Sequence, residues 1–203
     1  MATPTTTDEA RYYDALILAG GEGRRMGGLD KGLQAWLGAP LYRHVLARLQ
    51  AQALAPAHIL ISANRNAAVY GTAGHPVLPD LRPDHQGPLA GIEAGLLAAQ
   101  SDWLLCVACD MPQLPADLAK RLFAAIPMNG LASYATTDEG PQPVCCLLHR
   151  DVLGSLQAAL DANQGGVKRW LDTLSAGTAQ FDDARAFSNY NTQAALQDPS
   201  NLP

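Results

Sequence analysis

Short apolar runs alternate along the chain with longer segments of helical periodicity. The first run, Ala15–Ala19, contains no polar residue and is ended by two glycines, and a second run extends over Trp103–Ala108. Continuous apolar runs of this length are typical of strands buried on both faces of a parallel sheet. The segment 41–49, by contrast, carries its apolar residues at the spacing of a helix with one buried face.

The same patterns predict the remaining elements. Further strands are expected at 58–61, 76–79, 131–134, 143–148 and 179–181, with the third and fourth of these paired across the turn 138–140. Helices are expected over about a dozen residues from 41, briefly after 65, at 87–100, 115–126, 151–163 and 166–175, and after residue 192. This alternation predicts a doubly wound, mainly parallel sheet flanked by helices, a three-layer α/β/α fold.

Chain length sets the expected domain organisation. A chain of 203 residues can bury a substantial core within one domain without disulfides. We expect a single domain at 13–197, because no linker and no internal repeat divides this part of the chain. The first residues combine threonine with acid and lack an apolar core, so we expect a disordered tail at 1–12. A frayed C-terminus is expected at 198–203.

Charge and hydropathy narrow the classes of partner. The formal net charge is −5, which argues against a general nucleic-acid or membrane-surface binder. No apolar segment has the length needed to cross a bilayer. The N-terminal residues also do not form a signal peptide. A cytoplasmic protein is therefore expected.

Four cysteines raise the question of a metal site. Cys106 and Cys109 form a C-x-x-C motif, and Cys145 and Cys146 are adjacent. In extended chain an offset of one or three residues directs side chains to opposite faces. We therefore interpret all four as small core residues rather than as zinc ligands.

The loop after the first strand combines glycines with cations. Between residues 20 and 31 it contains five glycines, together with Arg24, Arg25 and Lys31. Glycine allows positive φ and a close approach of the backbone, so that N–H groups can form an anion-binding nest. Because the loop follows a buried strand, the sequence predicts a phosphate-binding site here.

Two common phosphate-binding motifs do not match this loop. A P-loop requires lysine directly after its second glycine, but Leu29 follows Gly28. The dinucleotide fingerprint requires a third glycine at the position of Met26. These mismatches argue against a P-loop NTPase and against a Rossmann oxidoreductase.

The motif that is present runs from Leu18 to Lys31 and reads L-A-G-G-x-x-x-R-M-G-G-x-D-K. It resembles the signature of nucleotidyltransferases, which join an NTP to a phosphorylated acceptor and release pyrophosphate. Within these enzymes it is most similar to the molybdenum cofactor guanylyltransferases, which attach GMP to molybdopterin. The resemblance is strongest over 15–40 and 76–115. It implies an enzyme with a Rossmann-like nucleotidyltransferase fold, which uses GTP and molybdopterin as substrates and requires Mg²⁺.

The resemblance and the strand ends together suggest catalytic residues. Arg25 and Lys31 would contact the β- and γ-phosphates, although both could instead be solvated loop cations. Asp110 ends a buried strand and precedes Pro112, as the metal-binding aspartate of the family does; its alternative role is a helix N-cap. The residues implied to line the nucleotide are Leu18, Ala19, Gly20 and Gly21, together with Lys31 and Asp110.

Selection of the base is assigned to Asp80 at the end of a short strand. A carboxylate can accept hydrogen bonds from N1–H and N2–H₂ of guanine, and it would repel the acceptor N3 of cytosine. Asp80 could instead help to orient the metal or simply form a turn after Pro79. Ser62 occupies a position where relatives often carry asparagine, so a base contact there is not predicted.

The acceptor site is indicated more weakly. Asn189 and Asn191 match an N-x-N-T element of the family, and two asparagines on a loop can bind the donor–acceptor edge of a pterin. They could equally form Asx-turns that cap the final helix. Lys168 and Arg169 are expected to face solvent. Proteins that deliver or receive the cofactor in the same pathway are candidate partners.

Two alternatives remain open from the sequence. The first is a sister nucleotidyltransferase, either a molybdenum cofactor cytidylyltransferase or an enzyme acting on a sugar or isoprenoid phosphate. By resemblance, Gly21 in the L-A-G-G element favours GTP over CTP. The second is a nucleotide-binding regulatory module without catalysis, against which the presence of both Lys31 and Asp110 argues.

Overall fold

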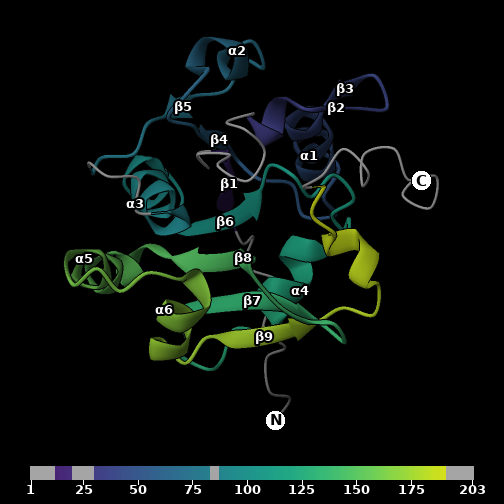
Figure 1. The fold of residues 1–203 in the computed structure, drawn as a ribbon. Helices are drawn as coiled ribbons and strands as arrows, with labels where there is room; N and C mark the ends of the chain where they lie inside the picture. The colour runs from purple at the N-terminus through teal and green to yellow at the C-terminus, as the bar shows by residue number, and fades with distance from the viewer. Residues whose placement is uncertain (1–11, 20–29, 83–86, 191–203) are drawn as a thin grey trace.

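The computed structural model describes residues 12–19, 30–82 and 87–190, which surround one central sheet (Figure 1). This sheet has seven strands in the order β5-β4-β1-β6-β8-β7-β9. The strands are β1 (Tyr13–Leu18), β4 (Ile59–Ser62), β5 (Val77–Leu78), β6 (Trp103–Ala108), β7 (Ala132–Thr137), β8 (Gly140–His149) and β9 (Gly177–Gln180). Within this sheet β8 runs antiparallel to β6 and β7, and the other pairs are parallel. The predicted mainly parallel sheet is confirmed.

Helices cover both faces of the sheet. They are α1 (Leu41–Gln50), α2 (Ala67–Gly71), α3 (Pro88–Ala98), α4 (Leu118–Ala124), α5 (Leu153–Asp161) and α6 (Val167–Thr173). Residues of α1 and α4 belong to one buried cluster, and residues of α3, α5 and α6 belong to another. Figure 1 shows the corresponding division, with α3 and α5 on one side of the sheet and α1 and α4 on the other. The three-layer α/β/α prediction is therefore confirmed.

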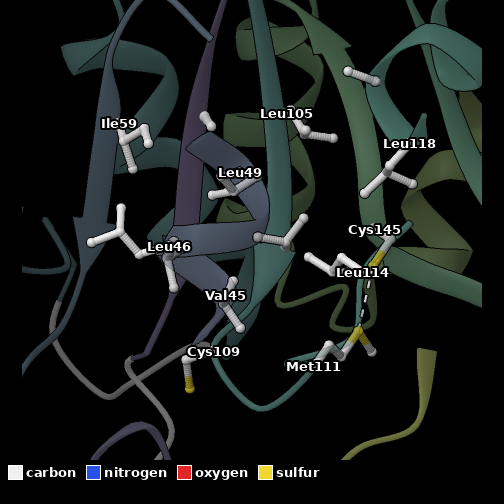
Figure 2. Packing of buried hydrophobic residues seen from close by; sticks show 14 of the residues in the cluster. Val45, Leu46, Leu49, Ile59, Leu105, Cys109, Met111, Leu114, Leu118 and Cys145 are labelled. Carbon is white, nitrogen blue, oxygen red and sulfur yellow. Dashed lines mark hydrogen bonds between the residues drawn. The ribbon is translucent and has the colours of Figure 1, made fainter. Parts of the chain in front are cut away.

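Strand β1 contributes side chains to both clusters. Ala15 and Ile17 belong to the cluster beneath α1, Leu16 belongs to the opposite cluster, and all three are fully buried. Leucines and valine of α1 pack over the first of these faces (Figure 2). Each fully buried aliphatic side chain typically contributes ~1.5–3 kcal/mol through the hydrophobic effect. This two-sided burial explains why the first strand of the sequence lacks polar residues.

The four cysteines divide between the two faces as expected. Cys109 and Cys145 belong to the cluster beneath α1 and α4, whereas Cys106 and Cys146 belong to the opposite cluster. All four are buried free thiols. Cys145 Sγ lies 3.4 Å from the sulfur of Met111, a contact drawn in Figure 2. The interpretation of these residues as parts of the core agrees with this packing.

Several short elements differ from the sequence prediction. A two-stranded hairpin, β2 (Ala35–Trp36) and β3 (Ala39–Pro40), precedes α1 and was not predicted, because two-residue strands carry no readable periodicity. Helix α4 is shorter than the predicted 115–126, and β7 and β8 are longer than predicted. The described residues also include the 3₁₀ segments η2 (Lys31–Leu33), η3 (Arg150–Val152) and η4 (Ala184–Phe187).

Some expectations concern residues that the structure does not describe. The predicted tail at 1–12 is described only at residue 12, and neither the last predicted helix nor the end at 198–203 belongs to the described ranges. Within the described ranges, no helix combines the length and apolarity required to cross a membrane.

Asp14, in β1, is an acid buried in the core near the start of the strand. Its carboxylate accepts hydrogen bonds from the backbone N–H groups of Gln100 and Ser101 at 2.6 and 3.1 Å and from the Ser101 hydroxyl at 2.9 Å. His58 Nδ1 lies 3.0 Å away. Burial opposes ionisation, but these hydrogen bonds outweigh it and lower the pKa of Asp14. The charged carboxylate thus fixes the loop between α3 and β6.

We expect Asp14→Asn to lower the free energy of unfolding at pH 7 by about 2 kcal/mol, because backbone donors lose a charged acceptor. The folded pKa of Asp14 is below the unfolded value, so its contribution is present at neutral pH and disappears as pH falls through the folded pKa. Urea unfolding at a series of pH values measures both effects.

The matched control is Asp102→Asn, which removes an exposed carboxylate paired with Arg150 at 3.1 Å. Exposed ion pairs contribute at most ~1 kcal/mol, so this variant should unfold almost like the wild type. Equal destabilisation by the two substitutions would contradict the role assigned to Asp14.

Candidate functional site

The site predicted from the sequence lies where four parallel strands end. The backbone continues the sheet beyond the strands: Ala19 N–H donates to Ser62 O at 2.8 Å and Cys109 N–H donates to Leu18 O at 3.1 Å. Ala63 N–H likewise donates to Leu78 O at 2.9 Å. The carboxyl ends of β5, β4, β1 and β6 therefore form one continuous edge, which is where ligands bind in open α/β sheets.

Lys31 and Asp110 meet at this edge. Lys31 begins η2 after the glycine-rich loop, and Asp110 follows β6. The Lys31 Nζ lies 3.7 Å from Asp110 Oδ2; the lysine side chain is 35% exposed and the aspartate 9%. The structure thus brings together two of the three residues predicted to be catalytic, although they are far apart in sequence.

Gly32 permits this approach of η2 to the end of β6. A Cβ atom added to Gly32 would overlap the Tyr70 hydroxyl and would lie 3.2 Å from Cys109 Sγ. A larger residue would require either η2 or the buried Tyr70 side chain to shift. The sequence prediction did not select Gly32, because its requirement for a small residue comes from distant contacts.

Asp30 anchors the end of the glycine-rich loop. Its carboxylate accepts hydrogen bonds from the Tyr70 hydroxyl at 2.6 Å and from the Asn66 amide at 3.0 Å. Burial raises the pKa of Tyr70, so this side chain stays a neutral donor. Asp30 is therefore bound to the segment after β4.

Asp110 carries its negative charge in a poorly solvated position. Burial raises the pKa of its carboxyl, and the nearby ammonium of Lys31 opposes this shift. Asp110 does not cap the following helix, because the N-cap position of α4 is Asp117. The backbone of Asp110 is also fixed, since its carbonyl accepts a hydrogen bond from Tyr190 N–H at 3.0 Å.

The residues present fit a magnesium ion that is bound mainly through a nucleotide. Mg²⁺ in such sites takes one or two protein carboxylates and completes its shell with phosphate oxygens and water. Asp110 supplies a carboxylate that burial makes costly to ionise without a cation. Among the described residues no group of three histidine, cysteine or acidic side chains forms a cage for a metal. This donor set suits a metal–nucleotide complex better than a structural ion.

Asp80 is held at the same edge by a residue that the sequence prediction missed. The Asn64 amide donates to Asp80 Oδ2 at 2.6 Å, and Asp80 N–H donates to Asn64 Oδ1 at 2.8 Å. The two residues follow β4 and β5, whose pairing brings them together. Asn64 comes shortly after β4, just as Asp80 comes shortly after β5. This position after a strand was the only feature of the sequence that could have indicated a role for Asn64.

The segment after Asp80 is fixed by a partly buried ion pair. Arg82 contacts Glu93 of α3 through two hydrogen bonds of 2.7 and 3.0 Å, and it contacts Asp161 of α5 at 2.5 Å. The Glu93 side chain is only 4% exposed. Bidentate pairing of this kind has a defined geometry. It therefore limits the positions open to the chain that carries Asp80.

The outcome for the other predicted residues is mixed. Leu18 and Ala19 lie at the carboxyl end of β1, in the middle of the site. Asn189 is exposed and directly precedes Tyr190. Lys168 lies 2.5 Å from Asp172 on the surface of α6, which agrees with its expected exposure. The remaining predicted residues lie outside the described ranges; they are Gly20, Gly21, Arg25 and Asn191.

Solved structures share this fold. The molybdopterin-guanine dinucleotide biosynthesis protein A from Archaeoglobus fulgidus is 20% identical, with a TM-score of 0.68 over 91% of this chain and 95% of that one. The 4-diphosphocytidyl-2C-methyl-D-erythritol synthase from Anaerococcus prevotii is 11% identical, with a TM-score of 0.72 over 93% and 94%. At these identities the similarity establishes the fold alone.

The sequence comparisons establish the family. A molybdenum cofactor guanylyltransferase from Bordetella pertussis is 44% identical over 90% of this chain and 93% of its own length. The enzyme of the same name from Cupriavidus metallidurans is 45% identical over 87% and 89%. Residues 15–179 match the sequence family described as "MobA-like NTP transferase domain". The chain belongs to this family of nucleotidyltransferases, as its sequence motif predicted.

We expect Asp110→Asn to separate activity from stability. Nucleotidyl transfer should fall by on the order of 100-fold or more, because a charge that stabilises the transition state is lost. The folded pKa of Asp110 is raised, so its ionised form costs stability as pH rises above the unfolded value. The nucleotide-free variant should therefore melt at a higher temperature than the wild type at pH 7.5.

Asp117→Asn is the control, because Asp117 is an exposed acid whose side chain lies 3.8 Å from Arg121. Its turnover and melting temperature should stay close to those of the wild type. Near-normal turnover in Asp110→Asn would rule out the metal-binding role, and a lower melting temperature would contradict the electrostatic argument.

Proposed function

We propose that this protein transfers GMP from Mg-GTP to the terminal phosphate of molybdopterin and releases pyrophosphate. The observation that carries this proposal is the Lys31–Asp110 pair, whose charged groups lie 3.7 Å apart beyond the carboxyl end of β6. This pair combines a cation for phosphate with a buried carboxylate for a metal. The names of the relatives that are 44–45% identical supply the nucleotide and the acceptor.

In the proposed reaction an oxygen of the acceptor phosphate forms a bond to the α-phosphorus of GTP. The bond from the α-phosphorus to the bridging oxygen breaks, and pyrophosphate leaves with the electron pair. The protein has little covalent chemistry to perform, so positioning and charge stabilisation provide the catalysis. No proton transfer from a side chain is required if the acceptor phosphate is already ionised.

Residues of the strand ends and of the glycine-rich loop are proposed to divide these tasks. Lys31 neutralises charge that develops on the leaving pyrophosphate, and Arg25 of the glycine-rich loop is proposed to assist it. Asp110 would hold the magnesium ion, which, when bound, screens the triphosphate and polarises the α-phosphate. The N–H groups of the loop that follows Ala19 are proposed to surround the phosphates.

Recognition of guanine is assigned to Asp80. Its carboxylate presents two oxygens to the N1–H and N2–H₂ donors of the base. The hydrogen bond of 2.6 Å from Asn64 limits rotation of this carboxylate, which reduces the entropy lost when guanine binds. Asn64 therefore supports the base site without needing to touch the nucleotide.

The acceptor is proposed to bind on the side of the C-terminal segment, where Asn189 and Asn191 are the candidate contacts. The segment 188–190 borders Asp110, because Tyr190 N–H contacts the Asp110 carbonyl. Proteins that deliver or receive the cofactor are the proposed partners, and a cytoplasmic location stays a prediction.

Calorimetric titration with GTP, CTP, ATP and UTP, each with and without Mg²⁺, tests the nucleotide. A preference for Mg-GTP is expected, followed by pyrophosphate release that depends on molybdopterin. A preference for CTP would instead indicate the sister cytidylyltransferase. Nucleotide binding without turnover in the presence of molybdopterin would indicate a regulatory module or a different acceptor.

We expect Asp80→Asn to change the preferred base. The amide presents a donor where the carboxylate accepted, so GTP should bind about 10-fold or more weakly. Xanthosine triphosphate carries an oxygen in place of the 2-amino group, and its affinity should rise relative to GTP. Competition binding with the two nucleotides measures the ratio.

Asp151→Asn is the control, because this exposed acid contacts His149 at 3.2 Å. His149 pairs with Trp103 at the start of β6, the end of that strand away from the site. It should leave the ratio of the two affinities unchanged. An unchanged ratio in Asp80→Asn would show that Asp80 does not bind the base.

A further inference from the structure

Tyr190 is a buried aromatic residue at the border of the site. It follows η4, at the end of the described chain, and is 1% exposed. Its backbone N–H donates to the carbonyl of Asp110 at 3.0 Å. The C-terminal segment therefore contacts the residue that ends β6 directly.

The ring of Tyr190 contacts a different part of the site. It packs edge-on against Trp36 of the hairpin β2–β3, with 5.1 Å between ring centroids. This hairpin follows η2 after a single residue, and η2 begins with Lys31. One residue thus joins the backbone of Asp110 to the segment that carries Lys31.

Trp36 also contacts helix α1. The ring of His44, on α1, lies 4.8 Å from the indole, and His44 Nε2 lies 2.7 Å from the Trp36 carbonyl oxygen. The hairpin is therefore fixed to α1, which packs on the sheet. The ring of Tyr190 therefore packs, through Trp36, on a hairpin that is attached to α1.

The packing of Tyr190 is separate from the two cores of the sheet. Trp36, Leu41 and Tyr190 form a small cluster of their own, whereas the residues that cover the sheet belong to two larger clusters. Phe187, three residues earlier, belongs to one of the larger clusters and packs against Phe181. Loss of the Tyr190 ring should therefore disturb the site more than the sheet.

We propose that Tyr190 is a positioning residue that sets the separation of Asp110 from Lys31. It does so by holding the Asp110 backbone against the hairpin that follows Lys31. The proposal deepens the proposed function, because it rests on the roles given there to Asp110 and Lys31. Misplacement of a catalytic group by about 1 Å can cost on the order of 100-fold in rate, so such a contact can control catalysis without touching substrate.

The test compares Tyr190→Ala with Tyr190→Phe, which keeps the ring and its contact with Trp36. The dissociation constant of GTP is measured by calorimetry with and without Mg²⁺, and the ratio gives the gain in affinity that the metal supplies. In Tyr190→Ala this gain should fall about 10-fold or more, while GTP affinity without Mg²⁺ changes less than about threefold. In Tyr190→Phe, which keeps the ring contact with Trp36, the loss of this gain should be clearly smaller than in Tyr190→Ala.

Turnover and stability provide the second readout. The kcat for pyrophosphate release with molybdopterin should fall about 10- to 100-fold in Tyr190→Ala. Phe187→Ala is the matched control, because it removes a buried ring of the same segment from the sheet core. It should lower the melting temperature strongly and leave the gain from Mg²⁺ intact in the protein that remains folded.

Three outcomes would overturn the inference. The first is a full gain from Mg²⁺ in Tyr190→Ala. The second is an equal loss of GTP affinity with and without the metal, and the third is a loss confined to the melting temperature. If the wild type itself gains no affinity from Mg²⁺, the proposed function fails together with the inference. If the wild type gains that affinity but does not use molybdopterin, only the proposed acceptor fails, and the calorimetric comparison still decides the role of Tyr190.

Discussion

The pairing of β1 with β6 is the constraint on which the site depends. The two strands are parallel neighbours, with Leu18 opposite Ala108, and the contact from Cys109 N–H to Leu18 O extends the pairing beyond both strands. This register places the residue after Cys109 beside the chain that leaves β1. Because both strands are buried on two faces, a slip by one residue would turn apolar side chains toward the wrong layer. The hydrophobic core therefore fixes where the charged groups meet.

This arrangement leaves the Asp110 carboxylate poorly solvated, which costs free energy when the group is ionised. Burial raises the pKa of Asp110, and an ammonium at 3.7 Å offsets that effect only in part. An ionised group of this kind destabilises the protein until a cation arrives, which is common at sites that are organised to bind metal and phosphate. Asp14, near the other end of the same β1–β6 pair, shows the opposite solution. Four hydrogen-bonding contacts surround it, and its pKa is lowered. Two buried acids of one domain thus differ in what their neighbours supply.

Around this centre, pairs of distant residues limit the freedom of the loops. Asn64 and Asp80 bind each other across the ends of β4 and β5, and Asp30 is bound by Tyr70. Tyr190 contributes both a backbone donor and a ring. None of these contacts belongs to the regular hydrogen bonding of the sheet. Each uses the position of a strand end to restrain the segment beyond it, so that a rigid scaffold supports loops that can bind a ligand.

The sequence by itself determined the order of strands and helices, the mainly parallel sheet and the family. Two-sided burial leaves continuous apolar runs such as Ala15–Ala19, and phosphate binding requires glycines and cations at fixed spacing, so both are readable locally. It also indicated Lys31 from the glycine-rich signature and Asp110 from its place after a buried strand, both with the support of the family resemblance. Only the tertiary structure decided that Gly32 must be small and that Asn64 and Tyr190 support the site. These roles arise from contacts between residues far apart in sequence, and no local pattern encodes such a contact.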